Sequence, residues 1–260
     1  MTDSIKVLKS NGVLTLTFDR PDKKNAITDA MYEVLANELE SAETDSAVRA
    51  IIIRSEGELF TAGNDVSEFA RAAMSGTGLI NVGRFIVALA RATKPLVGAV
   101  QGKAVGVGTT LLLHCDHVIL ADDAQLTTPF VNLALVPEAA STMLLSNRIG
   151  HARAYTMFAL GQPVGATEAL AWGLANQVVS RADLDATAAT VAAKLAAQPL
   201  GALMATKKLM RDAAVIQRHI EVEGEIFAAA IKTPEAQEPS WPSPNGGRLT
   251  SASSADGRRP

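Results

Sequence analysis

The sequence has one cysteine, few aromatic residues and no long apolar run, and each absence excludes a class of protein. The single cysteine, Cys115, cannot form an internal disulfide, which is typical of a reducing compartment. Aromatic residues make up 4% of the chain, and no basic–aromatic patch of the kind that binds RNA is visible. No apolar run reaches the roughly 18–20 residues that span a bilayer. The first residues lack a secretion signal, so we expect a cytoplasmic protein with neither a membrane nor a nucleic-acid partner.

The composition is that of an ordinary globular protein. The chain has 260 residues, of which 48% are hydrophobic and 20% charged, so its core needs no disulfide or metal. Its formal net charge is −3, which provides no overall positive field. An anionic ligand would therefore need local positive groups or backbone N–H donors.

Short strands and helices alternate over the first half of the chain, a pattern that predicts an α/β fold with parallel pairing. Asn11-Gly12 indicates a hairpin between the first two strands, and Thr28 is a suitable N-cap for the first helix. We predict strands at Ile5–Leu8, Val13–Phe18, Ala50–Ile53, Leu96–Val100 and Val118–Ala121, and helices at Leu79–Ala92 and Gly106–Leu113.

From about Ala139 onward nearly every segment has a helical pattern, which indicates a helical subdomain or a surface for self-association. The helices are predicted at Ala139–Ile149, Ala152–Leu160, Thr167–Trp172, Leu184–Ala197, Leu200–Arg211 and Val215–Ile231. We expect a core over residues 1–195, a C-terminal helical subdomain over 196–235 and a disordered tail over 236–260.

Two glycine-containing segments follow predicted strands. In Phe60-Thr61-Ala62-Gly63-Asn64-Asp65-Val66, small residues allow a ligand to approach the main chain, although an ordinary turn capped by Asp65 explains the pattern equally well. In Gly102-Lys103-Ala104-Val105-Gly106-Val107-Gly108, a glycine-rich turn before a helix exposes N–H donors. A dinucleotide-binding loop begins in the same way, so this pattern alone is weak.

A third segment, Thr128 to Ser141, places Glu138 after an apolar stretch and at the start of a predicted helix. Apolar neighbours would raise the pKa of this carboxyl by desolvation, and a helix N-terminus would lower it. On position alone, Glu138 could serve only to stabilise the start of the helix.

Taken in order, these segments resemble the crotonase superfamily of enoyl-CoA hydratases and isomerases from about residue 5 to residue 235. Arg20-Pro21-Asp22-Lys23-Lys24-Asn25-Ala26 is similar to the first loop of the family, and the two glycine-containing segments are similar to its two oxyanion segments. The resemblance implies a spiral of β-β-α units with a C-terminal helical trimerisation region, and hence a homotrimer or a dimer of trimers.

The resemblance also implies that two backbone N–H groups, those of Asn64 and Val107, stabilise a thioester enolate. The residues implied to bind the substrate or its CoA moiety are Lys23, Ala26, Ala62, Gly63, Asn64, Asp65, Val107 and Phe130. No cofactor and no metal are expected, because coenzyme A is part of the substrate.

The residues at the catalytic positions distinguish between reactions. Hydratases of the family use two glutamates, whose positions are occupied here by Thr110 and Phe130. Glu138 lies where one branch of Δ3,Δ2-enoyl-CoA isomerases has its single acid/base. We therefore expect conversion of 3-enoyl-CoA to trans-2-enoyl-CoA, with Glu138, Asn64 and Val107 as the catalytic groups.

Other functions stay open at this stage. The first alternative is an enoyl-CoA hydratase, and the second is a non-catalytic scaffold that binds acyl-CoA or RNA. His114, Cys115, Asp116 and His117 could suggest zinc or a nucleophile, but no second ligand pair has the spacing of a structural zinc site. No Gly-x-Ser-x-Gly elbow supports a serine hydrolase.

Overall fold

The computed structural model describes residues 4–65, 67–68 and 80–237. The chain begins with the predicted hairpin, in which β1 (Ile5–Ser10) pairs antiparallel with β2 (Val13–Phe18). Asn11 and Gly12 have φ angles of 51° and 80°, as a two-residue type I′ turn requires. The turn chemistry of the sequence therefore predicts this element correctly.

A six-stranded sheet forms the centre of the fold, with strand order β1-β2-β3-β4-β6-β9. Every pairing from β2 onward is parallel. The additional strands are β3 (Ala50–Ser55), β4 (Leu96–Val100), β6 (His117–Ala121) and β9 (Gln177–Val179). Helices cover both faces, which is why β3, β4 and β6 each contain a run of successive apolar residues.

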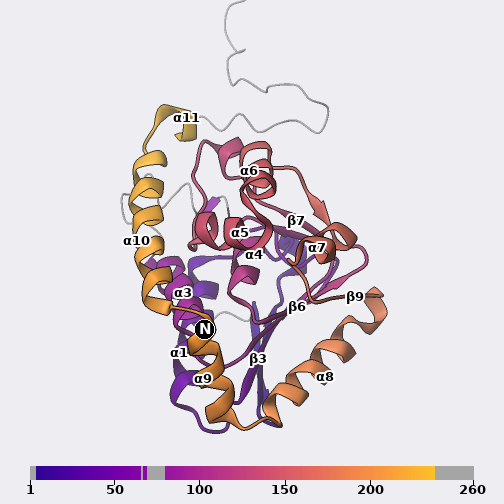
Figure 1. Ribbon diagram of the computed structural model, residues 1–260. Helices are drawn as coiled ribbons and strands as arrows, with labels where there is room; N and C mark the ends of the chain where they lie inside the picture. The colour runs from indigo at the N-terminus through magenta and orange to yellow at the C-terminus, as the bar shows by residue number, and fades with distance from the viewer. Residues whose placement is uncertain (1–3, 66, 69–79, 238–260) are drawn as a thin grey trace, which may run out of the picture.

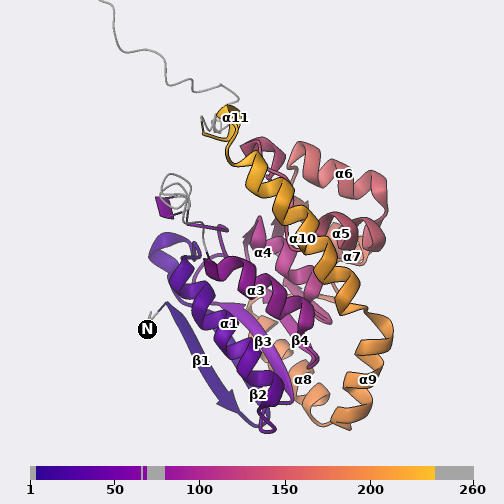
Figure 2. The same ribbon diagram turned by 90° about the vertical axis from the view of Figure 1, so that its left-hand side faces the viewer.

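The two faces of the sheet pack against different helices (Figures 1 and 2). Ile51 and Ile53 belong to the core shared with α1 (Asp29–Thr44) and α3 (Ile80–Arg91). Ala50 and Ile52 point to the opposite face and pack with α8 (Leu184–Ala196). The predicted N-cap is confirmed, because the N–H of Met31 donates to Thr28 Oγ1 at 3.3 Å.

A second, three-stranded sheet was not predicted. It contains β5 (Lys103–Val105), β7 (Gln125–Thr127) and β8 (Val164–Gly165) in the order β5-β7-β8. Because β4 is followed by β5 and β6 by β7, successive units each add one strand to the large sheet and one to the small sheet. This repetition is the spiral of β-β-α units that the sequence predicts.

The C-terminal half is mainly helical, as expected, apart from the short strands β8 and β9. Figure 2 shows α10 beside α3, so this C-terminal helix packs against an element of the N-terminal half of the fold. The helices not yet introduced are α4 of the N-terminal half (Val107–Thr110, continued by a 3-10 turn) and, in the C-terminal half, α5 (Ser141–Ile149), α6 (His151–Leu160), α7 (Ala166–Trp172), α9 (Leu200–Met210), α10 (Ala213–Ala230) and α11 (Pro234–Gln237).

The domain boundaries and the trimerisation role of the C-terminal helices stay predictions. Ala236 and Gln237, placed in the disordered tail by the sequence, belong to α11, and residues 238–260 lie outside the described residues. Of the described helices, no single one is long and apolar enough to cross a membrane. The segments Arg181–Ala196 and Leu200–Met210 meet that criterion only as a pair, bent by 103°.

Candidate active site

The two glycine-containing segments lie side by side. The N–H of Thr61 donates to the carbonyl of Lys103 at 3.1 Å, and the N–H of Val105 donates to the carbonyl of Thr61 at 3.1 Å. A Cβ on Gly63 would lie 3.0 Å from the carbonyl oxygen of Val105, and one on Gly108 would lie 2.4 Å from Thr61 Cγ2. Glycine at both positions is therefore what permits this close approach.

The N–H groups of Asn64 and Val107 are available to a ligand. Asn64 pairs with Ile27 in an isolated β-bridge. The bonds of this bridge are made by the neighbours of Asn64: the N–H of Ile27 donates to the carbonyl of Gly63 at 2.8 Å, and the N–H of Asp65 donates to the carbonyl of Ile27 at 2.9 Å. Val107 is the first residue of α4, where helical N–H groups have no intrahelical acceptor. Neither N–H donates to another residue in the described ranges, so each is free to donate a hydrogen bond to a ligand oxygen.

The first loop is joined to this site mainly through Asn25, which is 1% exposed. Its Nδ2 donates to the carbonyls of Glu56 and Leu59 at 2.8 and 3.0 Å. The N–H of Ala62 donates to the carbonyl of Lys24 at 3.0 Å, while the side chain of Lys23 is exposed and Ala26 is half-buried. The sequence places Asn25 in the family motif but gives no sign of this structural role.

The carboxylate of Asp65 is bonded within the protein. It accepts from Ser67 Oγ at 2.6 Å and from Arg20 Nη1 at 2.8 Å, and these bonds lower its pKa to about 2. It also accepts from the N–H of Ser67 at 3.1 Å and of Glu68 at 3.3 Å. The side chain thus acts as a cap at this turn, the simpler of the two interpretations that the sequence allowed. Val66 lies outside the described residues.

Glu138 is held in a defined position by α4. Its Oε1 accepts a hydrogen bond from Thr110 Oγ1 at 2.6 Å. Its Oε2 is buried and has no hydrogen-bond partner among the described residues. Burial raises the pKa of the Glu138 carboxyl to about 7; the Thr110 hydrogen bond opposes this rise, and the charge of Glu223 adds to it. A carboxyl with this pKa can both accept and return a proton near neutral pH.

The expectation that Glu138 opens a helix is wrong. α5 begins at Ser141, and Ala139 and Ala140 adopt a left-handed turn with φ angles of 64° and 55°. The Glu138 side chain makes no capping bond to α5, so the helix N-terminus does not counteract the effect of burial. The interpretation of Glu138 as a helix-stabilising residue is therefore excluded by its geometry.

Tyr32 of α1 is part of the site, although no sequence signal identified it. Its hydroxyl donates to Asn64 Oδ1 at 2.5 Å, and the residue is fully buried. Burial raises the pKa of Tyr32 well above its usual value, and the nearby charge of Glu138 adds to this rise. Tyr32 therefore stays a hydrogen-bond donor and connects the first oxyanion segment with the surroundings of Glu138.

Phe130 lies next to the second oxyanion segment. It is 7% exposed, and its Cζ is 4.0 Å from where a Cβ on Gly106 would lie. An apolar ring therefore lies close to the start of α4. Phe130 has no ionisable group, so the side chain at this position supplies no second acid or base to the site.

His114 and Cys115 are buried, and their surroundings favour a structural role over a catalytic one. Burial lowers the pKa of His114 to about 3 and raises that of Cys115 to about 12, so the imidazole and the thiol are both neutral. His114 Nε2 is 2.8 Å from the carbonyl oxygen of Ala139, and neutral imidazole can donate there. Over the described parts of the chain, no three His, Cys, Asp or Glu side chains gather in a way that could hold a metal.

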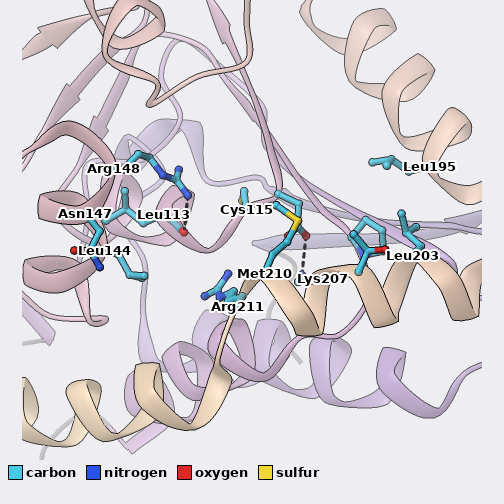
Figure 3. Close-up of a pocket in the computed structure, with 13 residues that line it drawn as sticks. Leu113, Cys115, Leu144, Asn147, Arg148, Leu195, Leu203, Lys207, Met210 and Arg211 are labelled. Atoms are coloured by element: carbon cyan, nitrogen blue, oxygen red, sulfur yellow. Dashed lines mark hydrogen bonds and ion pairs between the residues drawn. The ribbon is translucent and has the colours of Figure 1, made fainter.

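A cavity of about 510 Å³ lies elsewhere, between α9 and the core (Figure 3). Arg148, Lys207 and Arg211 contribute positive charge to its wall, and Lys207 Nζ lies 2.6 Å from Asp116 Oδ2. Neither Glu138 nor the two N–H donors line it. Within its wall, Arg148 and Arg211 donate to the carbonyls of Leu113 and His114, and Lys207 donates to Asp116.

Comparison with known proteins agrees with this geometry. The sequence profile of the family described as "Enoyl-CoA hydratase/isomerase" matches residues 8–240. The chain is 36% identical over 211 residues to 1,2-epoxyphenylacetyl-CoA isomerase of Escherichia coli K12, covering 78% of this chain and 79% of that protein. It is 34% identical over 212 residues to enoyl-CoA delta isomerase 2 of Rattus norvegicus, covering 80% of this chain but only 54% of the longer relative.

Among solved structures, that of Pseudomonas aeruginosa OdaA superposes with a TM-score of 0.87 and 41% sequence identity, covering 92% of this chain and 97% of that one. The chain therefore belongs to the enoyl-CoA hydratase/isomerase family. It has the crotonase fold and is an acyl-CoA enzyme of that family, so the family and the fold that the motifs predicted are both confirmed.

The Thr110 hydrogen bond leads to a prediction about pH dependence. Because this bond lowers the pKa of Glu138, Thr110→Val should raise that pKa, and the acidic limb of the kcat/KM profile should move to higher pH. We expect a displacement of about one to two pH units, since a hydrogen bond to a charged group contributes about 1.5–3 kcal/mol. Thr156→Val, at an exposed hydroxyl bonded to its own helix, is the control. A limb that stays in place in Thr110→Val would show that the bond does not act on the reacting carboxyl.

Proposed function

We propose that the protein is an enoyl-CoA isomerase, which converts 3-enoyl-CoA to trans-2-enoyl-CoA with Glu138 as its single acid/base. The observation that carries this proposal is the state of Glu138: one carboxyl oxygen is fixed by Thr110, the other is buried and unbonded among the described residues, and its pKa is about 7. The relationship to an enoyl-CoA delta isomerase supports the same reaction.

The reaction requires a proton to leave C2 of the thioester and another to arrive at C4. Glu138 removes the C2 proton, and the negative charge moves to the thioester oxygen. The N–H groups of Asn64 and Val107 stabilise that oxygen, a contribution of about 3–4 kcal/mol for each donor. Glu138, now protonated, returns the proton at C4, and the double bond is left conjugated with the thioester.

A hydratase would need a second group to activate water. At the positions of the two hydratase glutamates, the hydroxyl of Thr110 donates to Glu138 and Phe130 is buried. Neither side chain can act as a base near neutral pH. The arrangement therefore favours isomerisation over hydration, and the ionisable Glu138 favours an enzyme over a scaffold that only binds acyl-CoA.

The proposed function is tested by following the absorbance of the conjugated thioester. With 3-hexenoyl-CoA as substrate, we expect this absorbance to increase in the presence of the wild-type protein. With crotonyl-CoA, which is already conjugated, we expect it to stay constant. Loss of crotonyl-CoA absorbance at a rate that exceeds the isomerisation rate would identify the protein as a hydratase. Binding of CoA esters without any change of absorbance would identify it as a scaffold.

A further inference from the structure

Helix α10 carries a second buried carboxylate close to Glu138. Glu223 is 5% exposed, whereas Glu221 and Glu225 on the same helix are exposed. Its Oε1 accepts hydrogen bonds from the N–H of Thr142 at 2.9 Å and from Thr142 Oγ1 at 2.6 Å. Because Thr142 lies in the first turn of α5, this carboxylate supplies the helix with the acceptor that a capping side chain would otherwise provide.

The segment between Glu138 and Thr142 is the left-handed turn of Ala139 and Ala140. A residue other than glycine in this conformation costs about 1–2 kcal/mol, so the turn persists only where its surroundings stabilise it. His114 bonds to the carbonyl of Ala139 at one end, and Glu223 bonds to Thr142 at the other. These two buried side chains fix the backbone that directs Glu138 into the site.

The two carboxylates also interact electrostatically. The negative charge of Glu223 raises the pKa of Glu138. Burial raises the pKa of Glu223 itself, while the two bonds from Thr142 and the charge of His219 lower it. His219 Nε2 lies 3.5 Å from Glu223 Oε1 and 2.7 Å from Thr142 Oγ1.

The surroundings of the pair contain few other polar groups. From α4, Thr110 donates to Glu138, and from α1, Tyr32 is close enough for the charge of Glu138 to raise its pKa. The Oε2 atoms of Glu138 and Glu223 and the hydroxyl of Ser141 are buried, and none of the three has a hydrogen-bond partner among the described residues.

We propose that Glu223 is a positioning residue for Glu138, which stabilises the left-handed turn before α5 and holds a second negative charge close to the Glu138 carboxyl. This inference rests on the proposed role of Glu138 as the acid/base and extends it to the C-terminal helix. Glu223 does not touch the reacting atoms in this account, because its bonded oxygen is directed at the backbone of α5.

The charge of Glu223 is tested with Glu223→Gln, since the amide oxygen of glutamine can still accept from the N–H of Thr142. Loss of the negative charge should lower the pKa of Glu138, so the acidic limb of the kcat/KM profile should move to lower pH while KM stays unchanged. Glu225→Gln removes a charge from the exposed side of the same helix and should leave the limb in place. An unmoved limb in Glu223→Gln would overturn the inference.

The positional role is tested with Glu223→Ala, which removes the acceptor as well as the charge. We expect kcat to fall about tenfold or more below that of Glu223→Gln, because misplacement of the base by about 1 Å can cost 10²-fold. Circular dichroism of both variants shows whether the fold is kept. If Glu223→Ala is folded and as active as Glu223→Gln, the turn does not depend on this side chain, and the positional part of the inference is wrong.

A titration that does not depend on catalysis separates failure of this inference from failure of the proposed function. In carbon-13 NMR, the Glu138 carboxyl signal, assigned by its absence in Glu138→Gln, should titrate at lower pH in Glu223→Gln than in the wild type. If Glu138→Gln keeps full activity, the proposed function fails and the NMR comparison still decides the inference. If Glu138→Gln is inactive but the signal titrates identically in both proteins, the inference alone fails.

Discussion

Glu138→Gln is expected to lower kcat for the isomerisation of 3-hexenoyl-CoA by about 10²–10⁴-fold, the contribution of a positioned acid/base. Glutamine keeps the shape of the side chain and can still accept the hydrogen bond from Thr110, but it cannot take up the C2 proton. KM should change little, because the carboxyl contributes to the transition state more than to binding. Glu168→Gln, at an exposed glutamate of α7, is the matched control and should keep wild-type kinetics.

The same substitution should stabilise the protein at high pH, which distinguishes loss of the base from loss of the fold. The pKa of Glu138 is raised from 4.5 to about 7, so ionisation of this carboxyl opposes folding. That penalty is absent below pH 4.5 and complete above pH 7, where linkage sets it at up to about 3 kcal/mol. Glu138→Gln should therefore unfold at a higher temperature than the wild type at pH 8 but not at pH 4. A lower melting temperature at pH 8 would contradict this account.

Gly106→Ala is expected to produce the second large effect, a loss of about 10²–10³-fold in kcat through the oxyanion donor at Val107. Gly106 has φ 56° and ψ −117°, a conformation that residues with a Cβ scarcely adopt. Space is not the obstacle, because the added Cβ would meet only Phe130 Cζ at 4.0 Å. The backbone must rotate instead, and the N–H of Val107 then moves away from the thioester oxygen.

The control for this substitution is Gly165→Ala, at a glycine with φ −75° and open space around its Cα. It should be neutral in both activity and stability. In Gly106→Ala we expect a stability loss of about 1–3 kcal/mol, small enough to leave the protein folded. An unchanged kcat in a folded Gly106→Ala protein would show that the N–H of Val107 does not stabilise the intermediate.

The parts of the fold that the sequence predicts are those that local patterns determine. The hairpin at Asn11-Gly12, the cap at Thr28 and the buried strand from Ala50 were all found because turn chemistry and hydrophobicity act within a few residues. The strands Lys103–Val105 and Gln125–Thr127 were missed, because three residues are too few to show an alternation. They form through pairing with segments distant in the sequence.

The residues of the candidate site come from the motif resemblance and stay predictions, and the contacts that support them were not predicted. Motif resemblance placed Asn64, Val107 and Glu138, and the structure brings the segments of the first two together. Alanine carries no signal for a left-handed turn, so the start of α5 was placed too early by two residues, at Ala139 instead of Ser141. Tyr32 and Glu223 lie in ordinary amphipathic helices, where nothing in the sequence distinguishes a side chain that supports the site.

Transfer of the proton from C2 to C4 by one carboxyl can be measured directly with 3-hexenoyl-CoA deuterated at C2. The reaction is run in ordinary water, and the product is analysed at early times by NMR. Because the unbonded oxygen of Glu138 is buried, we predict that part of the deuterium removed from C2 appears at C4 of the trans-2-enoyl product. If C4 receives hydrogen only from the solvent, even in the first turnovers, the result contradicts transfer by a single buried carboxyl.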